Sequence, residues 1–232
     1  MENRELSEVQ KPIIAAIVPM RHHSERIPGK NYRLLNGLPL YHYIIDSLLA
    51  CNGVDKILID TDSPVIMKDA QEHFPGVLLY DRPPHLRNDH LSMNIVLENS
   101  IQQMPADYYI QTHSTNPLLR PETIDAAISK FFESDQDYDS LFSVTRIQTR
   151  LWDSAAMPVN HDPDVLLRTQ DLPPLFEENS CLYLFAGSEF RVSGNRIGKR
   201  PCLYEIDPLE SIDIDEESDF RLAEFQMKER EK

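Results

Sequence analysis

Long apolar runs and paired cysteines are both missing from this 232-residue chain, and each absence excludes a class of protein. No stretch approaches the roughly 20 apolar residues of a membrane-spanning helix. Residues 1–10 are charged and lack the apolar centre of an export signal. Cys51, Cys181 and Cys202 are widely spaced, which indicates reduced thiols rather than a disulfide framework or a zinc site. We therefore expect a cytoplasmic protein with no membrane attachment.

Cations are also scarce. The chain has 23 Lys and Arg residues against 38 Asp and Glu residues, which gives a formal net charge of −15. This balance argues against a nucleic-acid-binding protein, because such proteins gain affinity by neutralising phosphates with Lys and Arg. A small anionic ligand stays compatible with the charge, since a local group of cations can oppose the global field. The length and the 41% content of hydrophobic residues suit one sizeable core.

A cationic loop follows the first apolar run of the chain. Residues 13–18 are short, apolar and rich in β-branched side chains, so they predict a buried strand that ends at Pro19. Arg21, Arg26 and Lys30 come just after it. In open α/β sheets, ligands bind outside the carboxyl ends of the strands. The loop is therefore predicted to hold phosphate groups, and a solvated basic loop is the alternative interpretation.

A pair of carboxylates lies far along the chain. Asp213 and Asp215 are two residues apart, so in an extended segment both side chains project to the same face. Carboxylate oxygens in such a pair suit a hard divalent cation, which we expect to be Mg²⁺. The alternative is a surface edge that leads into an acidic helix start, where Glu216 and Glu217 complement the helix dipole.

Strands and helices alternate along most of the chain, which predicts a mostly parallel, doubly wound α/β sheet. Further strands are expected at 56–60, 77–80, 107–112, 141–145, 181–185, 203–206 and 212–214. Helices are expected at 41–50, 64–73, 93–103, 121–133 and 216–228, with Ser92 as the cap of the third of these helices.

Residues 151–176 break this alternation. They are rich in Pro and Asp and show little periodicity, which is typical of a functional loop, a lid or an arm. A mobile surface loop is the alternative. Two apolar segments, 165–167 and 172–176, lead us to expect a homodimer in which this stretch takes part.

These motifs together resemble the CMP-sialic acid synthetase (acylneuraminate cytidylyltransferase) family, and the resemblance runs from about residue 13 to residue 225. It rests on Arg-x-x-Ser-x-x-Ile-Pro-x-Lys-Asn at 21–31 and Ser-Ile-Asp-Ile-Asp at 211–215. Further matches follow in the expected order, at 36–40, 60–63, 80–83, 88–92, 115–118 and 170–173, with Asn179 and Tyr183. The resemblance implies an N-terminal tail at 1–12 and a Rossmann-like nucleotidyltransferase domain at 13–232. It also implies a protruding dimerisation arm at about 147–180.

The activity implied by the resemblance joins a 2-keto sugar acid to CMP from CTP and releases pyrophosphate. Such catalysis is largely positioning and electrostatic stabilisation. Arg21 would clamp phosphate oxygens with its planar fork, and Lys30 would act as a point charge on the triphosphate. Asp213 and Asp215 would hold Mg²⁺.

Other nucleotide contacts are implied by the resemblance alone. Ser24 and Asn31 would lie on the triphosphate and the nucleoside. Arg82 and Ser92 would help to hold the cytidine.

Three residues are candidates for the sugar side. Arg168 matches the family's arginine for the sugar carboxylate, and Tyr183 belongs to the segment that shapes the sugar pocket. His113 falls where the bacterial sialic acid enzymes have a glutamine, so a sugar contact is expected there. A solvated arm residue, a core tyrosine and a structural histidine are the respective alternatives.

Two other functions stay open. CMP-Kdo synthetases belong to the same superfamily, but they commonly read Arg-Leu-Pro-Gly-Lys-Pro where this chain has Arg26 to Asn31. Uridylyltransferases usually carry a Gly-rich loop that this chain lacks. A nucleotide-binding module without turnover is the last alternative, and the carboxylate pair argues against it. The identity of the sugar acid is left open.

Overall fold

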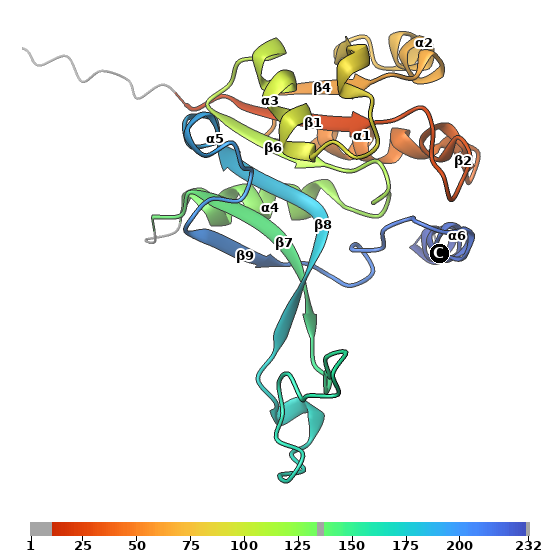
Figure 1. The fold of residues 1–232 in the computed structure, drawn as a ribbon. Coiled ribbons are helices and arrows are strands. Elements are labelled where there is room, and N and C mark those ends of the chain that lie inside the picture. Colours follow the sequence, from red (N-terminus) through yellow and green to blue (C-terminus); the bar gives the residue numbers. More distant parts are fainter. Residues whose placement is uncertain (1–10, 134–136, 231–232) are drawn as a thin grey trace, which may run out of the picture.

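The computed structural model describes residues 11–133 and 137–230, which form a seven-stranded sheet with helices on both faces (Figure 1). The predicted tail lies outside the described residues except for its last two. The strands are β1 (Ile14–Met20), β4 (Lys56–Thr61), β5 (Leu78–Asp81), β6 (Tyr108–Thr112), β7 (Ser140–Ile147), β8 (Leu175–Ala186) and β9 (Pro201–Glu205). The helices are α1 (Leu40–Ala50), α2 (Pro64–His73), α3 (Met93–Gln103), α4 (Pro121–Phe132), α5 (Gly187–Ser193) and α6 (Glu217–Arg230).

The sheet is mostly parallel, which confirms the expected fold class. Its strand order is β5-β4-β1-β6-β8-β7-β9. Parallel pairs join β1 to β4 and β6, β4 to β5, and β7 to β9. Only β8 among these strands runs antiparallel to both of its neighbours, β6 and β7. A separate ribbon of β2 (Leu34–Leu35) and β3 (Leu38–Pro39) precedes α1.

The central strand β1 is buried on both faces, which explains why its sequence is apolar without alternation. Ala16 and Val18 pack with residues of α1, α2 and α4, while Ala15 and Ile17 pack with residues of α3 and α5. The strand continues through Pro19 to Met20, so the expected end at Pro19 was wrong. Pro19 is tolerated because the pairing with β6 stops at Ile17 and only the pairing with β4 continues.

A long excursion between β7 and β8 projects from the body of the molecule (Figure 1). The two strands stay paired as they leave the sheet, out to Ile147 and Leu175. The segment 148–174 beyond them contains an isolated bridge between Trp152 and Pro158 and the 3-10 turn η3 (Thr169–Asp171). β8 therefore begins well before the expected strand at 181–185.

The strand expected at 212–214 was wrong, because this segment is irregular and pairs with no strand. Its apolar side chains instead join the core under α6, where Ile214 is fully buried. The backbone N–H of Ile214 donates to the carbonyl of Thr115 at 2.8 Å, which ties the segment to the chain just after β6. Within residues 11–133 and 137–230, no helix is long and apolar enough to cross a bilayer.

Candidate active site

A cleft of about 440 Å³ opens beyond the carboxyl ends of β1 and β6, where the sheet topology places ligands. It is lined by residues from the loop after β1, the segments before α3 and after β6, and the irregular segment before α6. Seven of the residues predicted to act are among its walls: Arg21, Ser24, Lys30, Asn31, His113, Asp213 and Asp215.

The loop 21–31 is shaped by one glycine and closed by one asparagine. Gly29 has φ +66, and a Cβ there would lie 2.6 Å from the ring of Tyr32, so another residue would be strained. Asn31 is buried; its amide donates to the carbonyl of Arg21 at 2.7 Å, and its Oδ1 accepts from the Ser114 hydroxyl at 2.7 Å. Asn31 thus links both ends of the loop to the end of β6.

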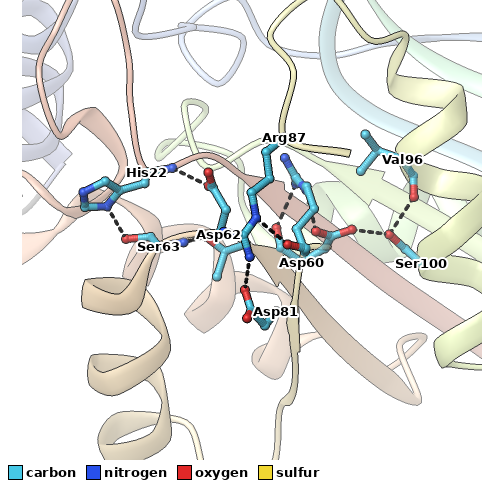
Figure 2. A network of polar contacts seen from close by, with 10 residues as sticks. His22, Asp60, Asp62, Ser63, Asp81, Arg87, Val96 and Ser100 are labelled. Carbon is cyan, nitrogen blue, oxygen red and sulfur yellow. Dashed lines mark hydrogen bonds and ion pairs between the residues drawn. The ribbon is translucent and has the colours of Figure 1, made fainter. Parts of the chain in front are cut away.

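The outer side of the loop is held by the start of α2 (Figure 2). The backbone N–H of His22 donates to Asp62 Oδ1 at 2.7 Å, and its Nδ1 lies 2.8 Å from the Ser63 hydroxyl. The same hydroxyl caps α2 by accepting from the N–H of Ile66 at 3.3 Å. The loop therefore rests on a capped helix rather than on solvent.

Lys30 joins this loop to the carboxylate segment. Its Nζ donates to the carbonyl of Ile214 at 2.6 Å and to Asp215 Oδ1 at 3.2 Å, and Arg26 contacts the same carboxylate oxygen at 2.7 Å. Partial burial by itself raises the pKa of Asp215, but the hydrogen bonds and charges of Lys30 and Arg26 outweigh it and lower this pKa below the ordinary value. Asp215 is therefore held as a carboxylate.

Asp213 is in a different state from its neighbour. Partial desolvation in the cleft raises the pKa of Asp213, and the charge of Asp215 adds to this effect, while a hydrogen bond with Thr115 and the charges of Lys30 and Arg26 oppose it. No Lys, Arg or His of the described residues forms an ion pair with Asp213 within 4.0 Å. Its side chain lines the cleft and is exposed to solvent.

Arg21 extends across the mouth of the cleft to Asp89, a cleft residue that the sequence did not single out for a role. The two side chains form an ion pair and are each about half exposed. Such an exposed pair is weak, so an anionic ligand can compete with Asp89 for the guanidinium. The hydroxyl of Ser24 turns back into the loop and accepts from the N–H of Ile27 at 3.4 Å.

His113 lies at the inner wall of the cleft and is neutral at physiological pH. Burial lowers its pKa to about 4, and the charges of Arg196 and Lys30 act in the same direction. Gln111 donates from its amide to His113 Nε2 at 2.9 Å, which places the remaining ring proton on Nδ1. An imidazole held in one tautomer is suited to a directed hydrogen bond.

Behind His113 lies a polar relay that the sequence did not reveal, in which Gln111 and Tyr183 are buried. The Gln111 side-chain oxygen accepts from Arg196, whose guanidinium lies 3.6 Å from the centroid of the Tyr183 ring. The Tyr183 hydroxyl donates to Glu178 Oε1 at 2.5 Å. No local pattern could have found this pair. Gln111 is an ordinary strand residue, and Arg196 lies 85 positions away from it along the chain.

Two predicted nucleotide contacts do not line the cleft. The Arg82 guanidinium is buried and donates to Asp60, to Oδ1 at 2.7 Å and to the carbonyl at 3.0 Å. The Ser100 hydroxyl completes this arrangement at 2.5 Å from Asp60 Oδ2 (Figure 2). Ser92 caps α3, where its hydroxyl accepts from the N–H of Asn94 at 3.3 Å. In this structure both residues support neighbouring segments.

Two predicted sugar contacts also lie away from the cleft of their own chain. Arg168 is 73% exposed on the projecting segment, where Asp171 accepts from its Nε at 2.7 Å. Tyr183 is fully buried, and the Arg196 guanidinium packs on its ring. Of the three sugar candidates, the structure brings only His113 to the cleft.

Comparisons with known proteins agree on one family. A family model described as "Cytidylyltransferase" matches residues 15–230. The "N-acylneuraminate cytidylyltransferase A" of Danio rerio is 31% identical over 219 residues, which are 91% of this chain and 50% of that protein. The N-acylneuraminate cytidylyltransferase of Streptococcus agalactiae serotype V is 25% identical over 219 residues, which are 90% of this chain and 52% of that protein. The chain spans about half the length of the curated relatives it matches.

Solved structures share the fold. A CMP:2-keto-3-deoxy-manno-octonic acid synthetase complexed with CTP has a TM-score of 0.67 at 15% identity, covering 94% of this chain and 99% of that one. The 4-diphosphocytidyl-2C-methyl-D-erythritol synthase of Anaerococcus prevotii has a TM-score of 0.69 at 11% identity, covering 94% and 96%. At these identities the likeness concerns the fold alone.

Proposed function

The chain belongs to the cytidylyltransferase family, and on this premise we propose that it transfers the cytidylyl group of CTP to a 2-keto sugar acid. A hydroxyl oxygen of the acid attacks the α-phosphorus and loses its proton to water, the bond to the leaving oxygen breaks, and pyrophosphate departs. One observation carries the proposal: the cleft sets Arg21 and Lys30 together with Asp213 and Asp215. The two cationic side chains can bind the phosphate oxygens of CTP, and the two carboxylates can bind the Mg²⁺ ion that accompanies the triphosphate.

The cationic residues of the loop would bind and orient the triphosphate. Lys30 keeps its ammonium group fixed between Ile214 and Asp215, so it offers a positioned charge that needs no reorganisation. Arg21 is free to exchange Asp89 for phosphate oxygens, which its planar fork fits. Charge that develops on the phosphate oxygens during transfer would then be stabilised in place.

Asp213 and Asp215 fit a Mg²⁺ ion, since they bring carboxylate oxygens to the same cleft and Asp213 has no cationic partner among the described residues. When bound, such an ion neutralises triphosphate charge and orients the reacting oxygens. Lys30 and Arg26 maintain the ionised state of Asp215, and Thr115 helps to hold Asp213.

For the acceptor we propose a sialic acid or a related nonulosonate. The relatives in Danio rerio and Streptococcus agalactiae carry the name N-acylneuraminate cytidylyltransferase, and they match nearly all of this chain. His113 would donate from Nδ1 to an oxygen of the sugar acid. This role is supported by its place in the cleft and by the tautomer that Gln111 selects.

We further propose that residues 13–232 form one domain. Two copies of this domain would assemble through its projecting segment, at about 147–180. Its apolar side chains are open to solvent: Leu166 is 86%, Met157 60% and Trp152 53% exposed. Apolar surface gathered on one projection suits a protein partner. Arg168 would then reach the cleft of the second copy and meet the sugar carboxylate there. A cytoplasmic location stays a prediction.

The test is pyrophosphate release in the presence of Mg²⁺, with CTP, UTP, ATP and GTP crossed against a panel of 2-keto sugar acids. We expect release with CTP and one nonulosonate. Release with CTP and Kdo alone would instead identify a CMP-Kdo synthetase. Tight CTP binding that does not need Mg²⁺, with silence across the whole panel, would favour a binding module without turnover. A monomer by light scattering at micromolar concentration would contradict the dimer.

A further inference from the structure

A second group of polar side chains lies outside the cleft, on α1 and α2. His42 comes from α1, and Asp69 and His73 come from α2. One possible ligand atom from each residue lies within 4.8 Å of the other two. Among the described residues, this is the one set of three or more His, Cys, Asp or Glu side chains that meets this criterion. The proposed transfer reaction uses none of the three.

The backbone sets these donors in place. Asp69 and His73 are four residues apart on α2, so their side chains stack on one face of the helix. His42 approaches that face from α1, with Nε2 at 2.6 Å from Asp69 Oδ2. His73 Nδ1 donates to the Asp69 carbonyl at 2.9 Å and lies 3.3 Å from Asp69 Oδ1. The two imidazole rings have centroids 5.2 Å apart.

The surroundings are those of a half-enclosed site. On the inner side, the His42 ring lies against Phe74 with centroids 4.7 Å apart, and Tyr41 donates a hydrogen bond to Asp69. On the outer side, half of the His73 side chain is open to solvent. The inner contacts would orient the ligands from the outer shell, and the open side leaves an entry path and a position for water.

We propose that His42, Asp69 and His73 bind a divalent transition-metal ion, with Zn²⁺ the best fit. Two imidazoles and one carboxylate form a borderline-soft donor set, and three protein ligands with water complete a tetrahedron. Metal–ligand bonds of about 2.0–2.1 Å separate tetrahedral ligand atoms by about 3.4 Å. His73 Nδ1 and Asp69 Oδ1 already stand at about this distance, while His42 Nε2 and Asp69 Oδ2 would have to separate by less than about 1 Å. To bind the ion, His73 Nδ1 would also give up its proton and its hydrogen bond to the Asp69 carbonyl.

The ion would tie α1 to α2, which bears on the cleft. Ser63 caps α2 and also contacts His22 of the loop 21–31. Because the same helix carries both the loop contact and two of the ligands, the ion would stabilise the platform on which the loop rests. The expected effect is a higher melting temperature of the whole chain rather than a new reaction.

The test uses the full chain after chelator treatment, with Zn²⁺ titrated by calorimetry and Co²⁺ followed by absorption. Because the cleft carboxylates are themselves proposed to hold a divalent ion, the background protein is the Asp213→Asn/Asp215→Asn variant. We expect one equivalent to bind there, with the visible bands of four-coordinate Co²⁺. His73→Ala should weaken binding by at least about 100-fold, since loss of an outer-shell partner alone costs 10–100-fold. His85→Ala, which removes an exposed histidine elsewhere, should bind as the background does.

Two results would overturn the proposal. One is equal Zn²⁺ affinity in His73→Ala and the background, which would assign binding to other residues. The other is no saturable binding in the background, which would leave a hydrogen-bonded cluster without a metal. If His73→Ala loses its circular dichroism signal, Asp69→Asn provides the same comparison with the side-chain volume kept. None of these readouts depends on turnover, so the transfer reaction and the metal site fail or succeed separately.

Discussion

Replacing Lys30 with methionine separates its structural work from its proposed chemical work. Methionine keeps much of the apolar stem and removes the ammonium group. The Lys30 side chain is only 12% exposed. The lost bonds are those to the Ile214 carbonyl and to Asp215 Oδ1. Asp215 keeps Arg26 as a partner at 2.7 Å, so its carboxylate is not left without a cation. We expect a loss of about 2 kcal/mol in the free energy of unfolding.

That loss should lower the melting temperature by roughly 4–8 °C, because each kcal/mol shifts a domain of this size by about 2–4 °C. Turnover should fall far more. Removing a positioned group that stabilises developing charge costs about 100- to 1,000-fold in kcat, or ~3–4 kcal/mol. The assay is pyrophosphate release under saturating CTP, at a temperature where circular dichroism shows the variant folded.

The matched control is Lys56→Met. Lys56 also donates to a backbone carbonyl, that of Pro105 at 3.1 Å, but it lies at the opposite end of its strand from the cleft. Its turnover should stay within twofold of the unmodified protein. If Lys30→Met retained turnover within about tenfold, the charge would have no role in the transition state, and Lys30 would be only an anchor for the segment 213–215.

Three further perturbations test other parts of the site. Asp213→Asn should lower turnover at least ~100-fold at every Mg²⁺ concentration with the fold intact, as checked by pyrophosphate release and circular dichroism. His113, with its pKa lowered to about 4 from the ordinary 6.5, binds fewer protons folded than unfolded between these values. Stability should therefore rise with pH across that window, by at most about 3 kcal/mol and less where water reaches the ring. Urea unfolding at several pH values should lose this component in His113→Gln, and an unchanged profile would contradict the buried neutral state. Gly29→Ala should destabilise the chain by at least about 1 kcal/mol, because φ is positive and the Tyr32 ring occupies the space of a Cβ. A melting temperature equal to that of the parent would refute this reasoning.

The parts of the fold that local signals encode were predictable. The helix expected at 64–73 is present as α2, and its start carries two local signals, the Ser63 cap and Pro64 in the first turn. The burial of β1 follows directly from its apolar run. The short helix α5 was not predicted, because its seven residues carry no helical pattern that distinguishes them from a turn.

The segment 212–214 shows why a pattern can be correct and its interpretation wrong. Ile214 turns inward and is fully buried, while Asp213 and Asp215 line the cleft, as alternation predicts. Extended backbone produces this period of two whether or not a strand lies beside it. Only tertiary structure decides whether a neighbour is present, and here the neighbour is the core under α6.

The site was likewise predictable only where its residues form local motifs. The loop 21–31 and the carboxylate pair could be found because each motif is local, and the cleft contains both. The relay through Gln111 and Arg196 could not be found, because 85 residues separate its two members. Arg82 shows the reverse case, since a motif match gives no information on the buried Asp60 that holds its guanidinium.

The contact between Lys30 and Asp215 spans 185 positions of the chain. Two segments that far apart are held together by the sheet and helices between them, so the cleft exists only when the chain is folded along nearly its whole length. Any partly folded or nicked form that releases the segment before α6 would lose the carboxylates and the partner of Lys30 in one step. Nucleotide binding would therefore report on the integrity of the entire chain, and a bound nucleotide would protect regions far from itself by mass action.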